Sequence, residues 1–97
     1  MTYYIRLLKF TQTGAAGLKD FSKIREEFRS KASELGIKVH AEYITLGRYD
    51  LVTVLEATDE KVILKLHAAF AAPAGRVSTE TLAAVPAEEF ANILKTV

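Results

Sequence analysis

Two segments of this 97-residue chain carry apolar side chains at consecutive positions, and this pattern predicts β-strands that are buried on both faces. The first segment is Thr2–Phe10, in which Arg6 and Lys9 are the charged exceptions. The second is Leu51–Ala57, which opens with Leu-Val-Thr-Val-Leu. Strands of this kind are normally covered on both sides, so the fold must provide a layer over each face of its central strands.

Three further segments show the apolar periodicity or the end signals of helices. Leu18–Leu35 repeats apolar residues at spacings of three and four, and Gly36 follows where a left-handed C-cap is easiest. A second helix is predicted from Asp59 to about Ala72, with Thr58 as its N-cap. Pro86–Lys95 predicts a short third helix, because proline suits the first helical position.

The remaining two strands are predicted from alternation. Residues 37–46 and 77–85 alternate in character, as half-buried strands do. Gly47 and Arg48 between two strands suit a two-residue hairpin turn with glycine at its first central position. In the first of these strands the alternation predicts one shared face for five residues, namely Ile37, Val39, Ala41, Tyr43 and Thr45.

The element order predicts an α+β fold of the ferredoxin-like class. Two split βαβ units form a four-stranded antiparallel sheet with two helices on one face, and the C-terminal helix follows. Residues 1–97 are expected to form one domain of this kind. The central strands are apolar on the other face as well, and a monomer rarely exposes such a surface. We therefore expect a second copy to cover it, giving a homodimer or higher oligomer of the dimeric α+β barrel type.

Composition excludes several classes of function. The absence of cysteine excludes disulfides, thiolate zinc sites and cysteine nucleophiles. The formal net charge of +1 gives no electrostatic case for nucleic acid. No apolar run approaches the ~18 residues of a membrane span, and no charged-then-apolar leader opens the chain, so we expect a cytoplasmic protein without membrane contact.

The segment Leu46–Val52 resembles the Gly-x-Tyr-Asp signature of the GYD domain family, small bacterial and archaeal proteins of unassigned function. The resemblance extends over nearly the whole chain, including the opening strand and the segments Tyr43–Leu46, Glu56–Asp59, Thr79–Leu82 and Glu88–Phe90. Two positions depart from the family pattern. The first helix lacks the usual Ser-Pro before an arginine, and Thr58 stands where proline is frequent.

The same Gly-x-Tyr-Asp hairpin is also similar to the effector-binding domain of the leucine-responsive regulators. That resemblance implies the same strand order, assembly into oligomers and binding of small amino acids near the hairpin. The DNA-binding half of those regulators has no counterpart here, so it implies only ligand sensing and assembly.

Six residues around the hairpin are the candidate ligand-binding set: His40, Tyr43, Gly47, Tyr49, Asp50 and Glu80. Gly47 fits a turn position with positive φ. Asp50 can accept hydrogen bonds from backbone N–H groups of the turn, or it can serve a ligand ammonium group or act as a general base. The two tyrosines are either packing residues or proton donors. Glu80 either faces solvent at a sheet edge or lies buried between subunits.

No motif predicts a metal or a cofactor, and we expect neither. His40 and Glu42 lie two residues apart on a predicted strand, but two ligands without a third make a poor metal site. Gly14 and Gly17 precede the first predicted helix, where backbone N–H groups can bind an anion.

Three functional hypotheses follow. The first is a homo-oligomeric small-molecule-binding or regulatory module, because no catalytic constellation is evident. The alternative is a cofactor-independent enzyme, monooxygenase- or isomerase-like, in which Tyr43, Tyr49, Asp50 and His40 share a pocket; this is an analogy at the level of the fold. The third is a scaffold for another protein, which an exposed apolar stripe at Phe90, Ile93 and Leu94 would favour.

Overall fold

The computed structural model describes residues 1–10, 21–70 and 77–97, and it has the ferredoxin-like element order that the sequence predicts. The described elements are β1 (Thr2–Phe10), α2 (Phe21–Glu34), β2 (Lys38–Ile44), β3 (Leu51–Ala57), α3 (Glu60–Phe70), β4 (Val77–Ala84) and α4 (Ala87–Leu94). The loop with Gly14 and Gly17, residues 18–20 of the first predicted helix and residues 71–72 of the second lie outside the described residues.

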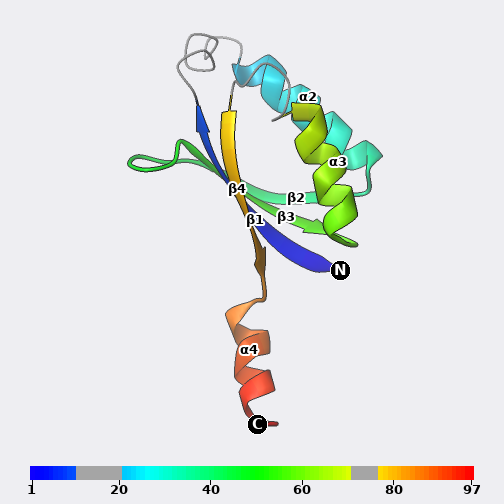
Figure 1. The fold of residues 1–97 in the computed structure, drawn as a ribbon, viewed down its shortest axis with the longest axis vertical. Helices are drawn as coiled ribbons and strands as arrows, with labels where there is room; N and C mark the ends of the chain where they lie inside the picture. Colours follow the sequence, from blue (N-terminus) through cyan, green and yellow to red (C-terminus); the bar gives the residue numbers. More distant parts are fainter. Residues whose placement is uncertain (11–20, 71–76) are drawn as a thin grey trace.

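The four strands form one antiparallel sheet in the order β2-β3-β1-β4 (Figure 1). The two segments that are apolar on both faces, β1 and β3, are therefore the central strands, as predicted. Helices α2 and α3 cover one face of the sheet, which we call the covered face. The other face carries no described helix, and we call it the open face.

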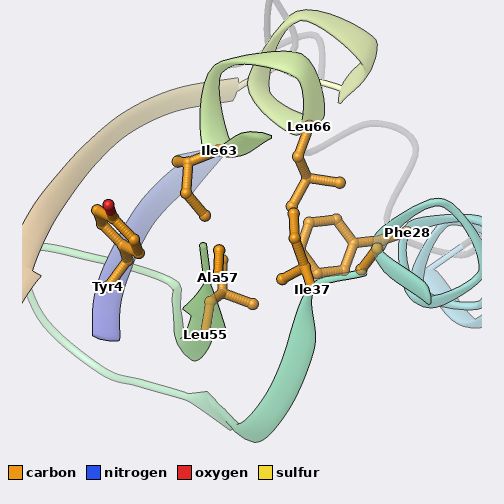
Figure 2. Close-up of a cluster of buried hydrophobic side chains, with 8 residues drawn as sticks. Tyr4, Phe28, Ile37, Leu55, Ala57, Ile63 and Leu66 are labelled. Carbon is orange, nitrogen blue, oxygen red and sulfur yellow. The ribbon is translucent and has the colours of Figure 1, made fainter. Parts of the chain in front are cut away.

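The core lies between the covered face and the two helices (Figure 2). Along β1 and β3 every second side chain is buried, because strand residues alternate between the two faces. Leu55 and Leu66 are the largest apolar side chains with almost no exposure. The core cluster comprises Tyr4, Phe28, Ala32, Ile37, Leu55, Ala57, Ile63 and Leu66.

The end of α2 confirms the glycine C-cap. Gly36 has φ 75°, a conformation that a residue with a Cβ adopts only at a cost. The N–H of Gly36 donates to the carbonyl of Ser33, and the N–H of Ile37 donates to that of Ala32. These two bonds are the Schellman pattern, which places Ile37 against Ala32 in the core.

The start of α3 differs from the prediction. Asp59, rather than Thr58, supplies the cap: its Oδ1 accepts from the backbone N–H groups of Lys61 and Val62 at 2.9 and 3.2 Å. The carboxylate also lies at the positive end of the helix dipole. It therefore accepts hydrogen bonds from the first backbone N–H groups of α3 and also compensates the partial positive charge of the helix N-terminus.

The alternation predicted for β2 is interrupted by a β-bulge at His40. Val39 pairs with Leu55, whereas Ala41 pairs with Val54, so His40 is an extra residue on this strand. An extra residue shifts the side-chain alternation by one position. Val39 therefore lies on the covered face, whereas Ala41 and Tyr43 lie on the open face, and the predicted common face is wrong.

The hairpin between β2 and β3 is longer than the predicted two-residue turn. The N–H of Thr45 donates to the carbonyl of Asp50 at 2.9 Å, so four residues form the loop between them. Gly47 has φ 106°, which confirms the expected positive φ although the turn type is different. The loop extends away from the body of the sheet (Figure 1).

Two apolar surfaces remain uncovered. The open face carries apolar side chains on both central strands, among them Ile5 and Val54, which pair directly. Helix α4 stands clear of the body of the domain and has no buried residue (Figure 1). Phe90, Ile93 and Leu94 expose about half of their surface. None of the described helices is both long and apolar enough to cross a membrane.

Candidate functional site

Asp50 of the signature joins the hairpin to the end of β1. Its Oδ2 accepts from the backbone N–H of Phe10 at 2.8 Å, and its own N–H donates to the carbonyl of Leu8 at 2.8 Å. The hydroxyl of Thr45 donates to the carbonyl of Tyr49 at 2.6 Å and holds the loop closed. One oxygen of the Asp50 carboxylate is therefore bound to the backbone, but the donor belongs to β1 and not, as the sequence had suggested, to the turn.

Tyr49 of the hairpin loop contacts Glu80 of β4, the strand at the opposite edge of the sheet from β2. The Tyr49 hydroxyl donates to Oε2 of Glu80 at 2.5 Å, linking the loop to β4. Glu80 is exposed and Tyr49 is half-buried. The hydrogen bond to the Glu80 carboxylate raises the pKa of Tyr49 above its usual value, because the carboxylate stabilises the neutral phenol.

His40 has a different partner from the one the sequence indicates. Its Nε2 lies 2.8 Å from Oε1 of Glu56 on β3, and its ring lies 5.5 Å from that of Tyr3. The bulge places His40 on the open face, whereas Glu42 lies on the covered face, so these two residues do not form a pair. Among the residues that the structure describes, no three His, Asp or Glu side chains are grouped closely enough to hold a metal.

The six predicted residues do not form one centre within a single chain. Glu56, which binds His40, stands opposite Tyr3, whereas Glu80, which binds Tyr49, stands opposite Leu7. Four residues along β1 correspond to about 13 Å at ~3.3 Å per residue. His40 and Tyr49, two residues of the enzyme hypothesis, therefore have their partners about four residues apart along β1. The ligand role of the six residues stays a prediction.

A polar row that sequence reasoning missed crosses the covered face. The strand pairing aligns Glu42, Thr53, Arg6 and Thr81, one residue from each strand. The neighbouring rows hold Leu51 beside Leu8 and Leu55 beside Tyr4, which are all buried. The sequence feature that could have indicated this row is Arg6, a charged residue in the middle of a mainly apolar strand.

Arg6 is the buried charge of this row. It is only 5% exposed, and its guanidinium lies 5.3 Å from the centre of the Phe28 ring. Burial lowers the pKa of Arg6 to about 10, so the guanidinium stays protonated at neutral pH. Among the described residues no carboxylate lies within 4.0 Å of it.

Glu42 at the end of the row is bound by two arginines of α2 instead. The guanidinium of Arg29 lies 2.7 Å from its Oε1, and Nε of Arg25 lies 3.3 Å from the same atom. The Glu42 side chain is only 8% exposed, so the two helical arginines neutralise a carboxylate that has little access to water. This arrangement also ties α2 to β2.

A pocket of about 80 Å³ lies between α2 and the sheet, with Arg6 and Thr53 in its wall. Most of its lining is apolar and includes four aromatic rings. The lining residues are Arg6, Leu8, Phe10, Phe21, Ile24, Arg25, Phe28, Glu42, Leu51, Thr53, Phe70 and Val77. The pocket lies on the covered face and contains none of the six residues predicted for a site.

Comparison with known proteins identifies the sequence family and supports the fold. The GYD domain matches residues 4–94. A protein of Thermus thermophilus named "glutamine synthetase and cystathionine beta-lyase binding protein" is 36% identical over 98 residues, covering 98% of this chain and all of the relative.

Solved structures share the fold at lower identity. A protein described as a hypothetical protein from Pyrococcus horikoshii superposes with a TM-score of 0.54 at 19% identity, covering 88% of this chain and 90% of that one. TTHA0845 from Thermus thermophilus superposes with a TM-score of 0.54 at 21% identity, covering 88% and 94%. At these identities the similarity shows the fold alone.

Proposed function

The chain belongs to the GYD domain family, and we propose that it is a homo-oligomeric binding module whose protein partner is a glutamine synthetase or a cystathionine β-lyase. The observation that carries the proposal is the exposed apolar stripe of α4. The name of the 36% identical relative, which states that it binds these two enzymes, indicates the kind of partner.

Helix α4 has the features of a recognition helix. Phe90, Ile93 and Leu94 follow at spacings of three and four, so they lie on one side of the helix, whereas Asn92 lies on another. An amphipathic helix of this kind binds by placing its apolar residues in a groove of the partner. Because α4 stands clear of the sheet, a groove can enclose it without displacing any other described element.

The open face supports self-association. Ile5 and Leu7 on β1 lie beside Val54 and Val52 on β3 and form an apolar centre. Charged groups border this centre: Glu56 lies at one end of the face opposite Tyr3, and Glu80 lies on the edge strand β4 beside Leu7. An apolar centre with a polar rim is the usual anatomy of a protein interface, and a two-fold axis lets one face cover its own copy.

The two surfaces can act together, because they do not compete for the same residues. When two sheets pack face to face, each copy still carries its own α4 beyond the end of β4. The oligomer then presents at least two recognition helices, and a multisubunit enzyme can bind both. Two linked contacts bind more tightly than one, without any new type of contact.

The experiment measures binding of the purified protein to a glutamine synthetase and a cystathionine β-lyase from the same organism by biolayer interferometry. We expect binding to at least one enzyme. Phe90→Asp should weaken it by roughly 30-fold or more, as loss of an aromatic anchor typically does. Asn92→Asp, which adds the same charge on the polar side of α4, is the matched control and should bind like the wild type.

Native mass spectrometry of the same proteins separates the two parts of the proposal. The wild type and both α4 variants should have the same oligomeric state. Failure of the wild type to bind either enzyme would overturn the proposed partner. Dissociation of the oligomer by Phe90→Asp would instead show that α4 covers a second copy.

A further inference from the structure

Arg6 is a buried cation that the described part of the chain leaves without an anionic partner. Its side chain faces the covered side of the sheet, where it lies beside the Phe28 ring and between apolar rows. Removing a charge from water is costly unless an opposite charge compensates it. The nearby carboxylate of Glu42 does not serve this purpose, because Arg25 and Arg29 of α2 bind it.

The pocket beside Arg6 supplies the space for a compensating anion. Its wall combines the guanidinium with the rings of Phe21, Phe28 and Phe70, with aliphatic side chains and with the ion pair of Arg25 and Glu42. A ligand that fits this wall has one negative group and an otherwise apolar body. The arrangement is typical of ligand sites, where a few polar groups orient a molecule that is bound mainly through apolar contacts.

We propose that this pocket binds a small apolar monocarboxylate, with the carboxylate on the guanidinium of Arg6 and the hydrocarbon body among the phenylalanine rings. A carboxylate matches the planar, two-pronged donor geometry of arginine. A phosphate dianion fits less well, because Arg25, the second described arginine of the lining, is already bound to Glu42, which leaves one guanidinium for the ligand.

The size of the pocket limits the ligand. A water needs roughly 10–15 Å³ of such volume, so the 80 Å³ pocket has room for roughly five to eight non-hydrogen atoms. A branched aliphatic acid such as 4-methylpentanoate is of this size. The proposal goes beyond the protein-binding role of α4 and does not depend on it, because the two sites share no residue.

The test uses 4-methylpentanoate and its neutral amide, 4-methylpentanamide, in isothermal titration calorimetry with the wild-type protein. The two probes have nearly the same shape and differ in charge. We expect the acid to bind at least about tenfold more tightly than the amide, because only the acid forms an ion pair with Arg6, in which donor and acceptor are both charged. Equal binding of the two probes, or no binding of the acid, would overturn the proposal.

Two matched variants locate the site. Arg6→Met should abolish binding of the acid, whereas Arg48→Met, the same exchange at an exposed arginine of the hairpin loop outside the pocket lining, should leave it within about twofold of the wild type. Binding of the acid to Arg6→Met with wild-type affinity would contradict the assignment. If Arg6→Met does not fold, Ile24→Trp tests the same site, because the larger side chain fills the pocket while Arg6 is kept. We expect Ile24→Trp not to bind the acid. Retained binding by Ile24→Trp would place the acid elsewhere.

Discussion

The carboxylate of Asp50 accepts a hydrogen bond from the backbone N–H of Phe10 at 2.8 Å, across 40 positions of sequence. This bond fixes the β2–β3 hairpin to the end of the central strand β1. The bond is partly buried, and a carboxylate acceptor makes it stronger than a neutral one. The aspartate of the family signature therefore has a defined structural role in the hairpin.

Removal of this carboxylate should destabilise the fold. We expect Asp50→Ala to lower the free energy of unfolding by about 1.5–3 kcal/mol, because the N–H of Phe10 loses its acceptor. Asp50→Asn keeps an acceptor oxygen and should cost less. Urea denaturation of the three proteins measures the difference, and an unchanged unfolding midpoint for Asp50→Ala would show that water replaces the carboxylate.

The bond between Tyr49 and Glu80 should be visible in a pH titration. The pKa of Tyr49 is raised by the Glu80 carboxylate, so Glu80→Gln should lower it toward about 10. The stabilising contribution of this bond is complete below pH ~10 and is lost as the pH rises through the raised pKa of Tyr49. Carbon-detected NMR of the tyrosine rings measures the titration. Glu56→Gln, at the far end of the open face, is the control and should leave Tyr49 unchanged.

A charge on the open face should dissociate the proposed oligomer. Leu82 lies on this face opposite Ile5 and is 43% exposed, so β4 should tolerate a polar residue there. We expect Leu82→Glu to shift native mass spectra from dimer or higher oligomer to monomer, because the oligomer would bury the new carboxylate. Leu64→Glu places the same charge on an exposed leucine of α3 and should leave the mass unchanged. Dissociation by both variants, or by neither, would count against the open face as the interface.

The loop glycine should be costly to replace. Gly47 has φ 106° and open space where a Cβ would stand, so the cost of Gly47→Ala is that of the backbone conformation rather than of a clash. We expect a loss of about 1–2 kcal/mol. Gly47→Asn should lose less, because asparagine tolerates positive φ better than alanine does. Thermal unfolding of both variants measures the difference, and equal stability of alanine and glycine would show that the loop adopts another conformation.

The central strands were predictable because their own residues determine them. The bounds of β1 and β3 agree with the sequence prediction, since an apolar run bounded by polar residues leaves few alternatives. The β2 bulge was not predictable, because the phase of an edge strand depends on its pairing with β3. The four-residue loop is a separate difference: Thr45 and Asp50 are in the register that the predicted two-residue turn would give, but pairing stops one residue pair earlier.

The candidate site was predicted only in part. The sequence indicates the hairpin residues, and the structure brings Tyr49 and Glu80 together. It does not indicate that Glu42 and Arg6 lie in one row, because they belong to different strands and are aligned only through the pairing of both strands with β3. Side chains that meet only through strand pairing cannot be found by their spacing along the chain.

The polar row also helps to specify the register of β1 along β3. If β1 slipped by two residues along β3, the guanidinium of Arg6 would stand beside Leu51 or Leu55 instead of Thr53. Such a slip keeps the alternation of faces, so apolar residues alone would tolerate it. The arginine raises the free energy of such slipped pairings, so the native register of β1 and β3 is specified by this polar row as well as by the apolar pattern.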